Sequence, residues 1–200
     1  MKKNNLNKTY WENRYFQNQI GWDLGVISPA IKFWFDNEKN KSLNILIPGA
    51  GIGYEAKYGF ENGFINIFYL DLSDNAVKGF KKNCPYFPNE QILMIDFFDL
   101  SKIGFFDVIL EQTFFCAINP ILRKKYVDKA YQILNSNGKI FGLLFEKIFN
   151  TEGPPFGGSH KNYYELFSRK FDVKTLEKTK KSVSARKGFE LWMEAKKKES

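Results

Sequence analysis

Five continuous apolar runs, separated by segments with helical patterns, constrain the fold of this chain more than any other feature. The runs are residues 43–48, 65–71, 91–95, 106–113 and 139–145. A strand that is buried on both faces of a parallel sheet is apolar along its length, because helices cover both faces. Two further runs, at residues 171–177 and 189–195, follow a Gly- and Pro-rich loop and predict an antiparallel hairpin at one sheet edge. The sequence therefore predicts an α/β fold with a seven-stranded, mostly parallel sheet.

Signals for helix starts and ends fall between these runs. Thr9 and Glu12 form a T-x-x-E pattern, which predicts a capping box that opens a helix through about Gln17. Further helices are expected after Ser28, from Ser73 toward Cys84, from Asn119 to Asn137 and Gly138, and from His160 to Arg169. These helices would supply the layers on both faces of the sheet.

The length and composition favour one domain. The chain has 200 residues, of which 44% are hydrophobic, and we expect residues 1–200 to form a single domain around one substantial core. Its 30 Lys and Arg against 22 Asp and Glu give a net charge of +8, but the basic residues are spread along the whole chain. Such a spread is typical of solvated surface, so we expect no nucleic-acid partner, and we take the protein to be a monomer.

The numbers of cysteines and histidines and the lengths of the apolar runs argue against several other protein classes. The chain has only Cys84, Cys116 and His160 of these residue types, with no CxxC spacing, so the sequence predicts neither a disulfide framework nor a metal site. No apolar run has the length of a signal peptide or of a membrane span. We therefore expect a cytoplasmic protein without a membrane partner.

A glycine-rich turn follows the first apolar run. Gly49, Gly51 and Gly53 lie at the carboxyl end of a central strand, where open α/β sheets bind their ligands. The dinucleotide fingerprint G-x-G-x-x-G requires a glycine where this chain has Tyr54. Asp71 ends the second run 22 residues after Gly49, a position from which a carboxylate can accept both hydroxyls of a ribose. These residues predict an adenosine-containing cofactor and argue against NAD.

Polar residues also end the third and fourth runs. Asp96 can accept a hydrogen bond from an adenine amino group, and the ring or backbone amide of Phe97 can face the adenine edge. Core packing of the Phe97 ring fits the spacing equally well. Glu111 and Gln112 end the fourth run, and their side chains point to opposite faces because strand residues alternate. We expect Gln112 to be the one that faces the cofactor.

Three aromatic residues near the N-terminus form a separate pattern. Trp11 and Tyr15 are four residues apart on one helix face, and Trp22 follows shortly after. Aromatic faces attract a cation such as a sulfonium by roughly 0.5 to 2 kcal/mol, so these rings suit a lid over a sulfonium cofactor. An aromatic stripe that docks the helix on the sheet would give the same pattern, and the three residues alone favour this second interpretation.

Several motifs in consistent order resemble the thiopurine S-methyltransferase family, and within it the plant-type halide and thiol methyltransferases. They cover roughly residues 9–160 and are WENRYFQNQIGWDLGVISP, ILIPGAGIGYEA, LDLS, IDFFDL, FDVILEQTFFCAINP and EGPPFGGS. Several motifs in register are much more specific than any one of them. The resemblance therefore favours the lid interpretation of the N-terminal aromatic residues.

The resemblance implies a Rossmann-like fold, S-adenosylmethionine as cofactor and methyl donor, and an N-terminal helical lid over residues 1–35. On the positions that match the family's motifs, the expected cofactor contacts are Trp11, Tyr15, Trp22, Gly49, Asp71, Asp96, Phe97 and Gln112. Gln112 falls where the halide and thiol enzymes carry a tyrosine, and Tyr15 replaces a tryptophan that is common there. Neither change removes the site.

The expected reaction is methyl transfer to a small thiol, hydrosulfide or halide. Transfer from a sulfonium to an anion neutralises opposite charges, so positioning and desolvation can supply much of the rate without a strong base. We accordingly assign no catalytic residue, and we expect Phe114 or Phe115 and residues 154–156 to line the acceptor pocket. Two alternatives stay open, a non-catalytic methyltransferase-like binding protein and an NAD-dependent oxidoreductase.

Overall fold

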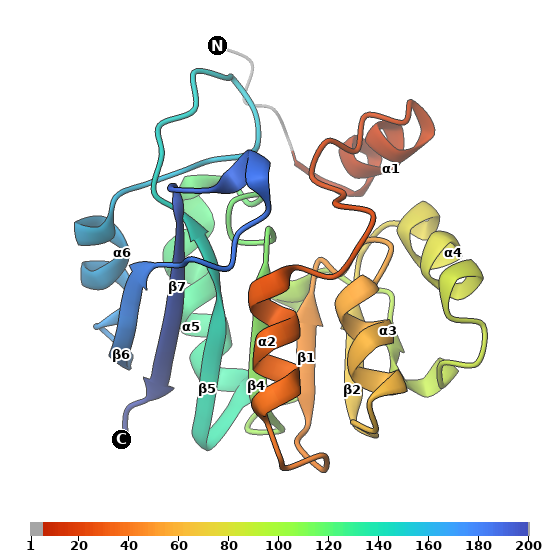
Figure 1. The fold of residues 1–200 in the computed structure, drawn as a ribbon, viewed down its shortest axis with the longest axis horizontal. Coiled ribbons are helices and arrows are strands. Elements are labelled where there is room, and N and C mark those ends of the chain that lie inside the picture. The colour runs from red at the N-terminus through yellow and green to blue at the C-terminus, as the bar shows by residue number, and fades with distance from the viewer. Residues whose placement is uncertain (1–5, 200) are drawn as a thin grey trace.

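The computed structural model describes residues 6–199 and contains a seven-stranded sheet (Figure 1). The strands are β1 (Ile45–Pro48), β2 (Ile67–Leu70), β3 (Ile92–Leu93), β4 (Phe106–Gln112), β5 (Leu134–Phe145), β6 (Phe171–Lys178) and β7 (Glu190–Lys197). Their order is β3-β2-β1-β4-β5-β7-β6. The first five strands pair in parallel, whereas β7 is antiparallel to both β5 and β6. The predicted Rossmann-like sheet and its antiparallel C-terminal pair are confirmed.

Helices lie on both faces of this sheet. They are α1 (Lys8–Phe16), α2 (Pro29–Asn37), α3 (Tyr54–Glu61), α4 (Asp74–Asn83), α5 (Arg123–Ile133) and α6 (His160–Phe167), with short 3-10 helices η1 (Asn89–Gln91), η2 (Phe97–Asp99), η3 (Pro120–Leu122) and η4 (Ser184–Arg186). In Figure 1, α2 and α3 lie in front of the sheet and α5 lies behind it. Ser73 caps α4 as expected, since its hydroxyl accepts a hydrogen bond from the Ala76 amide at 3.1 Å.

Two helix boundaries differ from the prediction. The first helix is capped by Asn7, whose side chain accepts from the Tyr10 amide at 3.1 Å, so the T-x-x-E capping box at Thr9 is wrong. Its glutamate, Glu12, instead accepts hydrogen bonds from Asn75 at the start of α4.

The fourth predicted helix ends four residues before the expected position. The helix α5 stops at Ile133 and not at Asn137 and Gly138. Leu134 already has extended backbone and pairs with Phe106 of β4, so sheet pairing determines the end of this helix. Residues 134–138 are the first part of the long strand β5.

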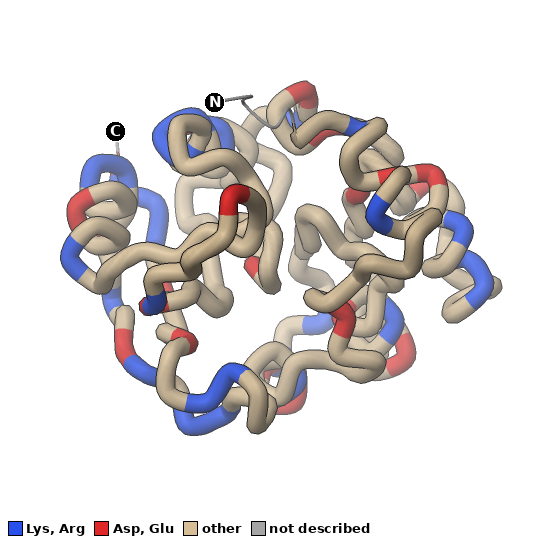
Figure 2. The backbone as a smooth tube through the Cα atoms, turned by 90° about the horizontal axis from the view of Figure 1, so that it is seen from above, with Lys and Arg blue, Asp and Glu red and all other residues tan. Residues whose placement is uncertain are grey.

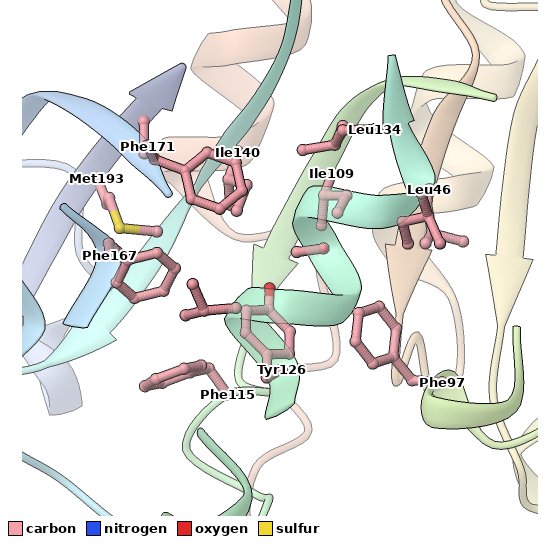
Figure 3. Packing of buried hydrophobic residues seen from close by; sticks show 14 of the residues in the cluster. Leu46, Phe97, Ile109, Phe115, Tyr126, Leu134, Ile140, Phe167, Phe171 and Met193 are labelled. Carbon is pink, nitrogen blue, oxygen red and sulfur yellow. The ribbon is translucent and has the colours of Figure 1, made fainter. Parts of the chain in front are cut away.

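Alternating residues of the central strands supply two buried clusters. On β1, Ile45 and Ile47 face the side covered by α2, α3 and α4, and Leu46 faces the side covered by α5 and α6. Figure 3 shows the second of these clusters, in which aromatic rings of α5 and α6 pack beneath the sheet. Burial on both faces explains why β1 and β2 are apolar throughout. In contrast, β3 is half-buried and residues 136–137 of β5 are exposed. Burial of the two faces leaves the carboxyl edge of the sheet as the place where polar groups gather.

The N-terminal segment lies over that edge (Figure 1). Residues before Ser28 run above the ends of the strands, while α2 packs Ile31, Trp34 and Phe35 into the core. The part of the expected 1–35 lid that lies over the site therefore ends near Ser28, and its first five residues fall outside the described range. Within residues 6–199, no helix is long and apolar enough to cross a membrane.

Candidate functional site

The turn after β1 has a backbone shape that depends on glycine. Gly49, Gly51 and Gly53 have φ angles of 58°, 58° and 76°, in the left-handed region that side chains disfavour. A Cβ at Gly53 would lie 2.2 Å from Cδ2 of Phe80, and one at Gly49 would lie 2.5 Å from Cδ2 of Phe114. The turn therefore runs close against its neighbours and leads directly into α3, so its amides can approach a ligand.

Asp71 is hydrogen-bonded to this turn. One carboxylate oxygen accepts from the Gly51 amide at 3.0 Å, and the other accepts from the Ser73 amide at 2.9 Å. Burial raises the pKa of Asp71 to about 6, although amide donors, including those of Ser73 and Gly51, oppose this shift. The Tyr69 hydroxyl donates to the Gly51 carbonyl at 2.7 Å, so both polar groups of this glycine are bonded to β2 and the residue that follows it.

The three predicted aromatic residues form one cluster. The ring centroids of Trp11 and Trp22 are 5.4 Å apart and those of Tyr15 and Trp22 are 5.7 Å apart, each pair packing edge to face. The Tyr15 hydroxyl lies 3.1 Å from the position that a Cβ at Gly51 would take. The aromatic cluster thus rests directly on the glycine turn, as a lid would.

Two polar contacts join the lid helix α1 to α4. Lys8 forms an ion pair with Asp74 at 2.9 Å, and Glu12 is bonded to Asn75. Both pairs lie at the surface or are half-buried. They therefore stabilise the contact between α1 and α4 less than buried apolar packing would.

A small cavity lies between the lid and the turn. It has a volume of about 40 Å³, and Trp22, Gly49, Gly51 and Gln112 are among its lining residues. The side-chain oxygen of Gln112 is buried without a hydrogen-bond partner, as expected for a group that awaits a ligand. The cavity is partly open and has room for only a few water molecules, so it is narrower than a nucleoside.

The end of β4 separates two neighbouring side chains as alternation predicts. Gln112 lines the cavity, whereas Glu111 is fully buried and accepts from the Phe115 amide at 2.8 Å and the Tyr126 hydroxyl at 3.1 Å. Burial raises the pKa of Glu111 to about 7. The next residue, Thr113, has a φ of 61°, a strained conformation for a β-branched residue that turns the chain beside the cavity.

Asp96 and Phe97 do not line this cavity. The Phe97 ring is 1% exposed and stacks on Tyr126 with centroids 5.1 Å apart, as Figure 3 shows. The Phe97 ring is used in core packing, so the Phe97 backbone is the part of this residue that is available to a cofactor. Asp96 is exposed three residues after the end of β3 and caps η2, where its carboxylate accepts from the Phe98 amide at 2.9 Å.

A larger groove lies elsewhere. It has a volume of about 410 Å³ and lies between α2 and the β5, β7 and β6 side of the sheet, with Trp34, Phe141 and Trp192 among its lining residues. None of the eight predicted site residues lines it. The smaller cavity is the candidate site, because Trp22, Gly49 and Gln112 line it and Asp71 is bonded to its Gly51.

Comparison with known proteins gives the same assignment as the geometry. The model of the family described as thiopurine S-methyltransferase matches residues 6–198. The chain belongs to the thiopurine S-methyltransferase family. It is accordingly an S-adenosylmethionine-dependent methyltransferase, which confirms the expected enzyme class and cofactor and sets the NAD alternative aside.

Two relatives and one solved structure illustrate the similarity. The chain is 28% identical over 184 residues to a probable thiol methyltransferase 2 of Arabidopsis thaliana, covering 90% of this chain and 81% of that protein. It is 25% identical over 187 residues to thiocyanate methyltransferase 1 of Brassica oleracea, with the same coverage. The fold matches Burkholderia thailandensis 1,6-didemethyltoxoflavin-N1-methyltransferase with a TM-score of 0.74 at 15% identity, covering 97% and 88% of the two chains.

Two arginines hold backbone segments of this member of the thiopurine S-methyltransferase family in place, and sequence reasoning did not identify them. Arg186 donates from Nη2 to the Trp22 carbonyl at 2.8 Å. Arg123 donates to the carbonyls of Phe156 at 2.7 Å and Gly157 at 3.0 Å, and so holds the Gly- and Pro-rich loop. Neither arginine stands in a motif, and only the fold brings each to its partner, so the sequence offers no signal for them.

Proposed function

We propose that this methyltransferase acts on a small thiol or hydrosulfide, with halide as a further acceptor. The observation that supports the proposal most strongly is the aromatic cluster of Trp11, Tyr15 and Trp22 on Gly51, next to Asp71. Aromatic faces attract a sulfonium and exclude water from it. Relatives named thiol and thiocyanate methyltransferase support an acceptor that contains sulfur.

The residues around the turn fit the cofactor. S-adenosylmethionine, when bound, supplies a methyl group on a positively charged sulfur. We assign Asp71 to the ribose hydroxyls, Asp96 and the backbone of Phe97 to the adenine, and Gln112 to a polar group near the reacting centre. The left-handed turn at Gly49 leaves the backbone open to close approach. These roles use groups that are buried or already oriented by hydrogen bonds, which reduces the cost of ordering them on binding.

The acceptor side is built by the end of β4 and the loop after β5. Phe114 packs against Gly49, and the Phe156 amide donates to the Cys116 carbonyl at 2.7 Å, which brings the loop next to β4. Phe115 is 1% exposed and belongs to the core, so Phe114 is the better candidate for the acceptor wall. A soft sulfur nucleophile suits such an apolar wall, and a thiolate needs no strong general base.

The acceptor is tested by headspace analysis of volatile products. The protein is incubated with S-adenosylmethionine and, separately, with hydrosulfide, methanethiol, an aromatic thiol and iodide. We expect methylated product from at least one of the sulfur acceptors and little or none from the Asp71→Ala variant, which should bind cofactor more than about tenfold more weakly. If S-adenosylhomocysteine binds but no acceptor in this panel is methylated, the acceptor proposal is wrong while the cofactor site stands.

We also propose that the protein works in the cytoplasm as a monomer, on a small-molecule acceptor and without a nucleic-acid partner. Cys84 and Cys116 are both buried free thiols, which is usual in a reducing compartment. Light scattering on the purified protein tests the monomer, and a dimer mass would contradict it.

A further inference from the structure

The charged residues that line the candidate cavity are all acidic. Within residues 6–199 they are Asp23, in the segment between α1 and α2, and Glu55 in the first turn of α3. The Lys and Arg that give the chain its net charge of +8 are distributed around the molecule (Figure 2), and none of those described lines this cavity. The cavity therefore has a local charge opposite in sign to that of the whole chain.

The Tyr15 hydroxyl, which rests on the glycine turn, lies in the field of several carboxylates. Burial raises the pKa of Tyr15, and the charges of Asp71, Asp23 and Glu12 raise it further. Asp71 is bonded to Gly51 of the turn, and Glu12 lies on the same helix as Tyr15. A field that disfavours a negatively charged tyrosinate favours a positively charged ligand at the same place. The carboxylates around the turn therefore suit a cation.

Two arginines near the lid do not reverse this charge. Arg186 donates from Nη2 to the Trp22 carbonyl at 2.8 Å, but its Nη1 lies 3.6 Å from a carboxylate oxygen of Glu190. The guanidinium carbon of Arg14 lies 5.6 Å from the centroid of the Trp22 ring. Neither arginine lines the cavity, and the carboxylates around the cavity outnumber them.

Asp23 is the cavity carboxylate that is available to a ligand. It is half-buried and forms no ion pair within residues 6–199. Its Oδ1 accepts from the Gly25 amide at 2.7 Å, which fixes the side chain in the turn after Trp22. Desolvation and the charge of Asp23 raise the pKa of Tyr54, another residue of the cavity wall. The Asp23 charge therefore acts inside the cavity.

Glu55 is engaged in the fold instead. It is 7% exposed, and its Oε1 accepts from the Ser28 amide at 3.0 Å, where α2 begins. Burial raises the pKa of Glu55, so this carboxyl holds its charge less firmly than a solvated one. Asp23 is therefore the stronger source of negative charge in the cavity wall.

We propose that Asp23 makes the site select the positively charged cofactor over the neutral product that remains after methyl transfer. The inference rests on the proposed assignment of this cavity to the cofactor. S-adenosylmethionine carries a net positive charge, whereas S-adenosylhomocysteine is neutral, because the electron pair of the broken sulfur–carbon bond stays on sulfur. A carboxylate in the cavity wall attracts the first molecule and gives the second no advantage. Asp23 thereby favours both cofactor entry and product release.

Calorimetric titration with two unreactive ligands tests this selectivity without turnover. S-adenosylhomocysteine is neutral, and sinefungin carries an ammonium group on the carbon that replaces the methylsulfonium. Asp23→Asn keeps an acceptor for the Gly25 amide but removes the charge. We expect this variant to bind sinefungin about three- to tenfold more weakly and S-adenosylhomocysteine less than about twofold more weakly.

Two further variants separate charge from structure. Asp23→Glu keeps the charge but changes the side-chain length, and it should keep the preference for sinefungin within about twofold of wild type. The matched control is Asp172→Asn, at an exposed carboxylate on β6 that does not line the cavity, and it should leave both affinities unchanged.

Product inhibition gives the second readout. We expect the ratio of the inhibition constant of S-adenosylhomocysteine to the KM of S-adenosylmethionine to fall about three- to tenfold in Asp23→Asn, and the effect to shrink near 0.5 M salt. Equal weakening of both ligands in Asp23→Asn, or an unchanged affinity for sinefungin, would overturn the inference. Failure of the wild-type protein to bind S-adenosylhomocysteine would instead overturn the proposed cofactor site.

Discussion

The Asp71 carboxylate accepts a hydrogen bond from the Gly51 amide at 3.0 Å. This contact joins the turns that follow two neighbouring parallel strands, β1 and β2, and the Tyr69 hydroxyl joins the same glycine from the other side at 2.7 Å. The predicted ribose acid therefore also sets the shape of the glycine turn. A substitution at Asp71 should act on cofactor affinity both through the lost acceptor and through the turn.

The affinity for S-adenosylhomocysteine should depend on pH through this carboxylate. Burial raises the pKa of Asp71 to about 6, and only the ionised group can accept both ribose hydroxyls. We expect an affinity that is constant above about pH 7 and falls roughly tenfold per pH unit below 6. Calorimetric titration across this range measures it. In Asp71→Asn the affinity should be weak and independent of pH, and a wild-type affinity that stays constant down to about pH 5 would disprove the role.

Glu111 should make the protein less stable as the pH rises. Its pKa is raised from 4.5 to about 7 by burial, so the folded state holds the proton more tightly than the unfolded state. The stabilisation is fully present below about pH 4.5 and is lost by pH 7, a change of roughly 3 kcal/mol in the free energy of unfolding. Asp71 contributes with the same sign at lower pH.

The variant Glu111→Gln separates the contribution of this residue. Glutamine keeps an acceptor for the Phe115 amide and can bond to Tyr126, but it does not titrate. Urea denaturation between about pH 4.5 and 8 should show a flatter pH dependence than wild type. The same slope in both proteins would show that Glu111 does not titrate in this range.

Replacing Gly53 by alanine should destabilise the protein much more than replacing Gly63, which has a similar φ angle but free space where a Cβ would lie. Gly53 and Gly63 have φ angles of 76° and 86°, but only at Gly53 would a Cβ meet a neighbour, 2.2 Å from Phe80. We expect Gly63→Ala to cost about 1 to 2 kcal/mol of stability from backbone strain alone. Gly53→Ala should cost roughly 1 to 3 kcal/mol more because of the clash. Equal losses of stability in chemical denaturation would show that the Phe80 side chain moves aside at no cost in free energy.

Arg123 should affect the acceptor and not the cofactor. Its guanidinium bonds the carbonyls of Phe156 and Gly157, which positions the loop over the acceptor side. We expect Arg123→Lys to raise the KM for the acceptor by about three- to tenfold, since lysine lacks the planar fork. The affinity for S-adenosylhomocysteine should not change, and Lys124→Ala at the exposed neighbouring position is the control. An equal loss of cofactor affinity would indicate a general structural effect.

Strand periodicity and the glycine turn predicted most of the architecture. The apolar runs marked all seven strands, most closely β1, β2 and β4, which are largely buried on both faces. The third run was too long, since β3 has only two residues and Met94 and Ile95 are exposed, and β5 begins five residues before the fifth run. Alternation also separated Glu111 from Gln112 correctly, since one lies in the core and the other lines the cavity. These predictions succeeded because burial and strand alternation act on residues that are neighbours in the sequence.

The misses involve residues whose partners are distant in the sequence. Glu12 looked like half of a capping box, yet it bonds Asn75 on another helix. The spacing left core packing and an adenine contact equally open for the Phe97 ring, and Tyr126 gives the ring a buried partner. Arg186 reaches Trp22 from 164 residues away. Such contacts depend on tertiary packing, which a local pattern does not contain.

The cofactor site is tested by calorimetric titration of S-adenosylhomocysteine into the wild-type protein and two variants of the N-terminal segment. Trp22→Ala removes a ring of the cluster beside the cavity, and Phe16→Ala removes a ring that is 86% exposed. We expect wild type and Phe16→Ala to bind equally, Trp22→Ala to bind about tenfold more weakly, and NAD to give no binding heat. Absence of S-adenosylhomocysteine binding, or unchanged affinity in Trp22→Ala, would contradict a cofactor site beneath the aromatic cluster.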